Sequence, residues 1–109
     1  MSNSDAALVR HIISAIEQVE RYTRGMSESE FISRGMVRDA TVRQIEIISA
    51  AASSISFEFQ NAHPKLEWSK MIGLRKKIVP EIFSANPATI WNTIQDDLPP
   101  HKQALKKIL

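Results

Sequence analysis

The chain has 109 residues, with 14 lysines and arginines against 12 aspartates and glutamates, a formal net charge of +2, and no cysteine. This length suits one domain that buries roughly 65% of its unfolded surface. The lack of cysteine excludes disulfides, thiol nucleophiles and cysteine-based zinc sites. We therefore predict a single helical domain over residues 1–109 with no covalent crosslink.

Apolar residues recur at three- and four-residue intervals at the start of the chain. Leu8, Ile12, Ile16 and Val19 follow the period of an α-helix, and Gly25 is a suitable stop. No apolar stretch approaches the roughly 18 residues that span a membrane, and the amino terminus lacks the basic and then apolar run of a signal peptide. We predict a first amphipathic helix in a cytoplasmic protein without membrane association.

Two further helices are predicted before the middle of the chain. Ser27 and Glu30 have the spacing of a capping box, so a short helix begins there and ends near Gly35. Isoleucines, alanines and a phenylalanine then recur three and four apart, which predicts a long third helix from about Asp39 to Ala62. His63–Pro64 is expected to stop it.

Prolines divide the remainder of the chain. A fourth helix should run from about Trp68 to Val79, because Pro80 lacks the N–H that a helix interior needs. Asn86–Pro87 is a cap and first-turn signal for a fifth helix, which Pro99–Pro100 should end. The alternation typical of strands is absent from the sequence, so the predicted fold is an all-α antiparallel helical bundle of four main helices plus a short one.

Positive charge is concentrated in the second half of the chain. Eight cationic side chains follow His63, against four acidic ones: Lys65, Lys70, Arg75, Lys76, Lys77, Lys102, Lys106 and Lys107 against Glu67, Glu81, Asp96 and Asp97. Clustered cations favour RNA, nucleotide phosphates or an acidic protein. A solvated basic face is the more frequent explanation of such a run. Trp68 and Trp91 are expected in the core or at a dimer contact.

The spacing of several residues resembles the HepT-like proteins, helical members of the HEPN superfamily that pair with minimal nucleotidyltransferases in bacterial toxin–antitoxin systems. The residues that carry the resemblance are Trp68, Gly73, Arg75, Phe83, Trp91 and Asp97-Leu98-Pro99. The resemblance implies the bundle fold and a homodimer with two motif helices face to face. It also implies a metal-independent ribonuclease without a cofactor.

The motif of that family is degenerate in this chain. The family has Arg, four residues, His, one residue and Tyr; counted from Arg75, the His position is Pro80 and the Tyr position is Ile82. The third helix of the family commonly reads Ile-Gly-Glu-Ala, which places Ala50 at the carboxylate position, and Lys76 replaces the usual Asn. The scaffold is kept while the reactive groups are lost.

Metal-independent RNA cleavage needs a base for the 2′-hydroxyl, an acid for the leaving oxygen and a cation for the developing charge. The resemblance assigns acid/base chemistry to the motif His, phosphate binding to the Arg, and acceptance of AMP from the partner to the Tyr. In this chain Arg75 alone is left, with Lys76 and Lys77 as further candidates for RNA phosphates. Glu81 and the three histidines, His11, His63 and His101, are the groups that could replace the lost acid/base. No residue pair has metal-ligand spacing.

We therefore predict a HepT-like toxin–antitoxin protein that acts by binding a protein partner, RNA or both, with impaired or absent catalysis. The alternative is an active metal-independent ribonuclease toxin that uses Arg75 with a displaced acid/base; a plain dimerisation unit is a third interpretation. The expected partners are a second copy of the chain with Arg75 near the two-fold axis, a minimal nucleotidyltransferase of MntA type, and RNA. We expect Met71, Ile72, Ile78 and Val79 to expose the apolar surface for the dimer.

Overall fold

The computed structural model describes residues 3–82 and 87–109, and every regular element within those ranges is a helix. The predicted all-α class is confirmed. Asn86 and Phe83 lie outside the described residues. The elements are α1 (Asn3–Thr23), α2 (Glu28–Ser33), α3 (Gly35–Ser54), α4 (Phe57–Ala62), α5 (Trp68–Ile72), α6 (Leu74–Ile82), α7 (Ala88–Asn92), the π-helical turn η1 (Thr93–Asp97) and α8 (Leu98–Lys107).

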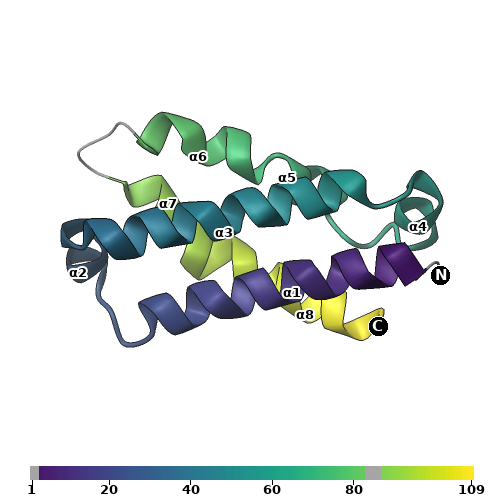
Figure 1. The fold of residues 1–109 in the computed structure, drawn as a ribbon, viewed down its shortest axis with the longest axis horizontal. Coiled ribbons are helices and arrows are strands. Elements are labelled where there is room, and N and C mark those ends of the chain that lie inside the picture. Colours follow the sequence, from purple (N-terminus) through teal and green to yellow (C-terminus); the bar gives the residue numbers. More distant parts are fainter. Residues whose placement is uncertain (1–2, 83–86) are drawn as a thin grey trace.

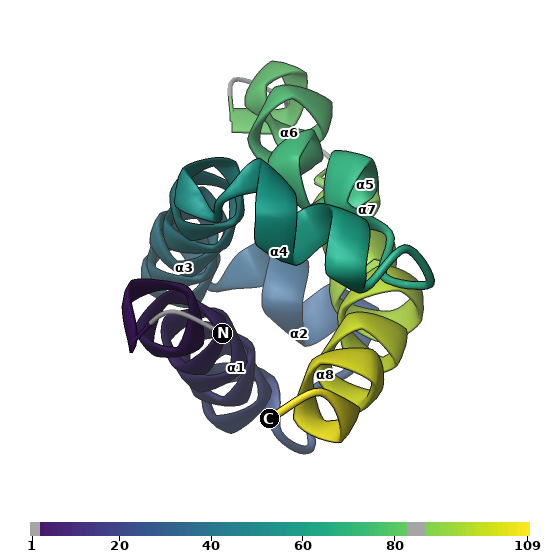
Figure 2. The ribbon, with the colours of Figure 1, turned by 90° about the vertical axis from the view of Figure 1, so that its right-hand side faces the viewer.

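The bundle consists of helical rods (Figure 1). They are α1, α3, the pair α5–α6, and the run α7–η1–α8. The first two rods lie antiparallel and side by side, α5 and α6 pack on α3, and α8 packs on α1. The short helices α2 and α4 lie at opposite ends of the bundle (Figures 1 and 2). One side of the molecule is therefore built from α1, α3 and α6.

One cluster of apolar side chains fills the space between the rods. Ile16, Ile48, Ile78 and Leu105, from all four rods, have no exposed surface. Trp68 is 6% exposed, which confirms its predicted place in the core. Trp91 is partly buried and lies against Phe31, with 5.4 Å between the ring centres. Within residues 3–82 and 87–109, no helix is both long and apolar enough to cross a membrane.

The first connection follows the sequence prediction closely. The chain leaves α1 through Gly25, whose φ of 75° lies in the left-handed region that favours glycine. The capping box that follows is confirmed: the Glu30 N–H donates to Ser27 Oγ at 3.2 Å, and Glu30 Oε1 accepts from the Ser27 N–H at 3.2 Å. These bonds satisfy backbone donors that the first turn of α2 leaves unpaired.

The predicted third helix is wrong at both ends. It begins earlier, at Gly35, and it ends at Ser54, where Ile55 is extended. A separate helix, α4, starts after Ser56, whose side chain accepts from the Phe59 N–H at 3.1 Å. Asp5 of α1 draws the chain away from the helix axis, because its carboxylate accepts from the Ser56 N–H at 2.9 Å and from its hydroxyl at 2.8 Å. Apolar periodicity could not reveal this long-range contact.

Pro80 does not end the fourth helical segment as predicted. The break falls instead at Gly73, between α5 and α6, and Pro80 lies inside the last turns of α6. A side chain at Gly73 would place its Cβ 3.2 Å from the Ser69 carbonyl oxygen, so the bend leaves little room there. Because Pro80 has no N–H, the Lys76 carbonyl lacks its usual helical hydrogen-bond donor. Pro80 is exposed, so solvent can bond that carbonyl instead.

Pro99–Pro100 were also predicted as a helix end, and the helix continues through them. The five residues before them form η1, in which the Leu98 N–H bonds the carbonyl of Thr93 five residues earlier. A π-turn is wider than an α-turn and therefore accommodates proline rings that would strike the carbonyl four residues back. The prolines then occupy the start of α8, where missing N–H groups cost little.

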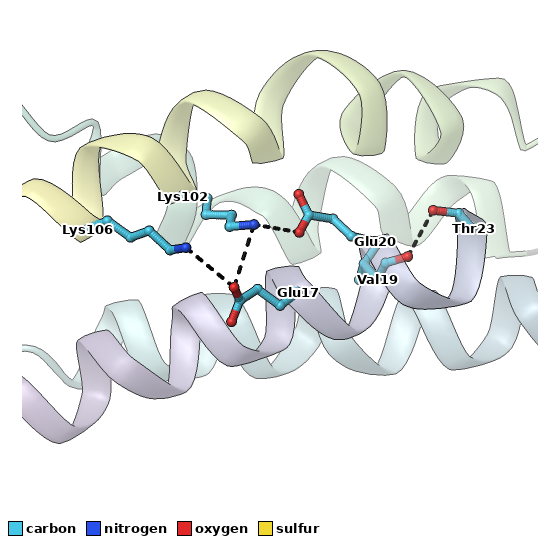
Figure 3. Close-up of polar contacts among 6 residues, drawn as sticks. All are labelled: Glu17, Val19, Glu20, Thr23, Lys102 and Lys106. Atoms are coloured by element: carbon cyan, nitrogen blue, oxygen red, sulfur yellow. Dashed lines mark hydrogen bonds and ion pairs between the residues drawn. The ribbon is translucent and has the colours of Figure 1, made fainter. Parts of the chain in front are cut away.

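Ion pairs join the basic carboxy-terminal helix α8 to α1 (Figure 3). Lys102 Nζ lies 2.7 Å from Glu20 Oε1 and 3.6 Å from Glu17 Oε2, and Lys106 Nζ lies 3.5 Å from the same Glu17 oxygen. The hydrogen bond to Glu20 raises the pKa of the Lys102 ammonium. Part of the positive charge counted in the second half of the chain is thus compensated by acids of the first half.

His101 is buried on α8, with 5% of its surface exposed. Burial lowers the pKa of its imidazole, while the carboxylates of Glu67 and Asp97 act in the opposite direction and Lys70 adds to the lowering. The side chain shares a pocket of about 270 Å³ with Leu74 and Lys77, among others. His101 is therefore a neutral packing residue at pH 7.

Acidification should destabilise the protein through His101. Because the folded-state pKa lies below the ordinary value, the unfolded chain binds a proton first, and stability falls as the pH drops below about 6.5. Urea unfolding of wild type and His101→Gln at pH 8 and pH 5 measures the effect. We expect a smaller loss of unfolding free energy between the two pH values in the variant; an equal loss would show that other groups carry the dependence.

Candidate functional site

Arg75 is placed by a serine of the neighbouring helix. The buried hydroxyl of Ser49 on α3 donates to the Met71 carbonyl at 3.2 Å and accepts from the Arg75 N–H at 2.9 Å. The Met71 carbonyl lies near the end of α5, where it also accepts from the Gly73 N–H, and the Arg75 N–H lies in the first turn of α6, where backbone donors lack an intrahelical acceptor. Ser49 occupies the position where the HepT-like pattern commonly has glycine, and glycine could make neither bond.

The Arg75 side chain lies across the surface of α3. Its Nε is 3.4 Å from Glu46 Oε2, and the two side chains are 62% and 36% exposed. Such a pair adds little stability because water competes for both charges. No other side-chain contact of Arg75 is recorded with the described residues, so the two terminal guanidinium nitrogens are available to a ligand.

A shallow groove of about 500 Å³ runs beside Arg75 over α1 and α3. The residues of α3 that line it are spaced three or four apart and therefore share one face of the helix. The full lining is Leu8, His11, Arg43, Glu46, Ile47, Ala50, Ala51, Ser54 and Arg75. Three potentially cationic side chains from three helices thus surround a floor of small and apolar residues.

The sequence analysis had named His11 only as one of three histidines, with no reason to prefer it. The structure brings its exposed side chain to the groove that contains Arg75. Arg43, also exposed and in the same groove, had not been singled out. In the sequence, Leu8 and His11 have helical spacing, and so do Arg43 and Ala50. This spacing indicates a shared site only once α1 and α3 are known to pack side by side.

The degenerate motif positions lie on the outside of α6. Pro80 is exposed and Ile82 is 46% exposed, and neither lines the groove. Ala50, the position of the family carboxylate, does line it and is exposed. The structure therefore leaves space where the resemblance implies an acid, and it provides no imidazole or phenol along α6 near Arg75.

The basic run after Arg75 does not form one patch. Lys77 turns away from the groove and forms an ion pair with Asp97, at 2.7 Å between Nζ and Oδ2. Lys76, which lies between Arg75 and Lys77 in the chain, is exposed. Successive residues of a helix are about 100° apart, so adjacent cations diverge. Of the three predicted phosphate-binding residues, the structure brings Arg75 alone into the groove.

The other acid/base candidates lie elsewhere. Glu81 accepts a hydrogen bond from Thr89 Oγ1 of α7 at 2.8 Å, and it does not line the groove. His63 lies against Phe59, with 4.6 Å between the ring centres. His101 is buried on α8. Over the described part of the chain, no three His, Asp or Glu side chains are grouped as metal ligands.

Comparison with known proteins places this architecture in a family. The family model described as Ribonuclease HepT-like matches residues 12–108. The chain belongs to the HepT-like ribonuclease family, and the resemblance drawn from its motif spacing is confirmed. His11 lies one residue before the matched span.

Named relatives agree with this assignment. "Probable ribonuclease HepT" of Thermococcus cleftensis is 29% identical over 99% of this chain and 98% of its own length. "Putative RNase TTE0752" of Caldanaerobacter subterraneus is 32% identical over 93% of this chain and 90% of its own. The chain spans 46% of a third relative, "Gamma-glutamylcyclotransferase and putative RNase MJ0434" of Methanocaldococcus jannaschii, at 28% identity. No solved structure was found to match the chain.

Removing the Ser49 hydroxyl should destabilise the fold. Ser49→Ala removes the hydroxyl that accepts from the Arg75 N–H and one of the partners of the Met71 carbonyl, and we expect a loss of about 1–3 kcal/mol in unfolding free energy. Urea denaturation measures it. Ser54→Ala is the matched control, because that hydroxyl is exposed and bonds only the Ala50 carbonyl of its own helix; we expect a change within about 0.5 kcal/mol. Equal effects would refute the role of Ser49.

Proposed function

We propose that this HepT-like protein acts by binding RNA, a protein partner or both, and that it does not cleave RNA. The observation that carries the proposal is the composition of the Arg75 groove. It retains a cation for phosphate, while Ala50 occupies the carboxylate position and α6 has Pro80 and Ile82 at the His and Tyr positions. Cleavage needs two proton-transfer groups beside the cation. The groove has one imidazole, and its one carboxylate, Glu46, is engaged by Arg75.

The proposed cellular setting is a toxin–antitoxin pair with a minimal nucleotidyltransferase of MntA type. Ile82 has no hydroxyl to receive AMP, so such a partner would act on this chain by contact alone. This is the part of the proposal that rests on family membership. The groove residues support the RNA-binding part directly.

One observation favours the alternative of an active ribonuclease. His11 lines the same groove as Arg75, and an imidazole is the side chain most often used as a general acid or base at neutral pH. In that case His11 and Glu46 would exchange protons with the RNA while Arg75 binds the phosphate. Glu81 is not suited to the task because Thr89 holds it against α7.

Cleavage of a labelled RNA pool in EDTA separates the two functions. We expect wild type to leave the RNA intact and Pro80→His/Ile82→Tyr to cut it, because the double variant restores both motif groups on α6. Arg75→Ala in the restored background should abolish cutting and serves as the control for a contaminating nuclease. If wild type cuts and His11→Ala does not, the alternative replaces the binding function.

We also propose a homodimer through α6. Met71 and Ile78 were expected to expose apolar surface, and that expectation is wrong because both have no exposed area and belong to the core. Ile72 and Ile82 are 37% and 46% exposed, and Val79 is partly buried. Arg75, Val79 and Ile82 are four and three residues apart and form one stripe along α6. Joining this stripe to a second copy would place Arg75 near the two-fold axis.

Light scattering tests the dimer at tens of micromolar protein. We expect wild type to have the mass of two chains and Ile82→Lys to shift toward the monomer, because a second cation in a stripe that contains Arg75 would be buried without an opposite charge. Phe57→Lys is the matched control: Phe57 is 82% exposed on α4, away from the stripe. A monomeric wild type would contradict the proposal, as would an equal shift in the control.

A further inference from the structure

We propose that His11 of α1 and Arg43 of α3 complete an anion site with Arg75, and that this site holds the phosphodiester backbone of single-stranded RNA. Neither His11 nor Arg43 belongs to the motif on α6. The inference rests on the proposed binding function and specifies its ligand. It assigns RNA to the groove over α1 and α3, and leaves a nucleotidyltransferase partner to other surfaces.

The first argument is the origin of the three side chains. His11, Arg43 and Arg75 come from three different helices and line one groove of about 500 Å³. Within the described residues, no ion pair is recorded for His11 or Arg43, and Arg75 has one weak contact through Nε. By contrast, Lys77 and Lys102 each lie 2.7 Å from a carboxylate. The groove therefore gathers one imidazole and two guanidinium groups, of which Arg75 alone has a recorded ion pair.

The second argument is the shape and polarity of the floor. Ile47, Ala50 and Ala51 of α3, with Leu8 of α1, give a smooth apolar surface between the charged side chains. A sugar or base edge can lie on such a surface while the phosphate contacts the rim. Ala50 is decisive because a carboxylate there would add a second negative charge beside Glu46. Its loss makes the groove a better anion site as well as a worse catalyst.

The third argument is the opposite role of Glu46. It follows Arg43 by three residues on the same face of α3, and it is the acidic residue of the groove lining. If the ligand is a polyanion, removing this charge should strengthen binding although it removes a recorded contact. A structural role for Glu46 predicts the reverse. The sign of one substitution thus tests the site.

The experiment measures binding of a labelled, short 2′-O-methyl oligouridine by fluorescence anisotropy at several salt concentrations. This RNA cannot be cleaved through its 2′-oxygen, so the result is independent of whether the protein is a nuclease. We expect Arg43→Gln and His11→Ala to weaken binding several-fold and His11→Lys to restore it. Arg43→Gln should also reduce the log–log salt slope by about 0.7, the value for one phosphate contact with a single strand.

Three controls make the result specific to the groove. Lys107→Gln removes one exposed cation from the end of α8 and should leave affinity and slope nearly unchanged. Glu46→Gln should tighten binding several-fold. Ala50→Glu should weaken binding, while Ala50→Gln, which has the same bulk without the charge, should not. Thermal melting of each variant confirms that the fold is intact.

Several outcomes would overturn the site. An effect of Arg43→Gln equal to that of Lys107→Gln would mean that RNA is attracted by overall charge. Weaker binding by Glu46→Gln would equally contradict the site. If the groove variants change the mass in light scattering and leave RNA affinity unaltered, the groove is a protein interface. Cleavage of unmodified RNA by wild type would refute the proposed function alone, because the anisotropy experiment would still measure the binding site.

Discussion

The position of Arg75 depends on one buried hydroxyl. The Ser49 hydroxyl bonds the Met71 carbonyl near the end of α5 and the Arg75 N–H near the start of α6. It therefore connects both helices to α3 at the bend around Gly73. A short bend between two helices has unpaired backbone groups on each side, and burying them unpaired would cost stability. The serine resolves this within the core. Everything that α6 presents to the groove follows from that contact.

The positions that the resemblance assigns to the motif lie on a different face of α6 from the core. Leu74 and Ile78 are buried, while Pro80 is exposed and Ile82 nearly half exposed. Substitutions on the outer face leave no cavity and strand no buried polar group, the two causes of large destabilisation. Different side chains at these two positions are therefore compatible with the bundle. Family membership does not by itself establish catalytic competence.

Net charge proved a poor guide to the functional surface. Lys102 and Lys106 hold α8 to α1, and Lys77 is paired with Asp97 of η1 (Figure 3 shows the α1–α8 pairs). Arg43, from the half of the chain without excess positive charge, lines the groove with Arg75. A paired cation attracts a polyanion less than an unpaired one at the same depth, since its field is largely cancelled nearby. Pairing in three dimensions therefore matters more than the count.

The sequence by itself determined the helical class, the first helix, the capping box and the absence of His and Tyr between Arg75 and Ile82. Each of these depends on residues within a few positions of one another, because helical periodicity and local backbone hydrogen bonding are set by near neighbours in the chain. Tertiary structure alone decided that Asp5 breaks the third helix at Ser56, that a π-turn carries α8 through two prolines, and that His11 and Arg43 join Arg75. Those outcomes depend on how helices pack, and packing unites side chains from distant parts of the chain whose spacing no local pattern records.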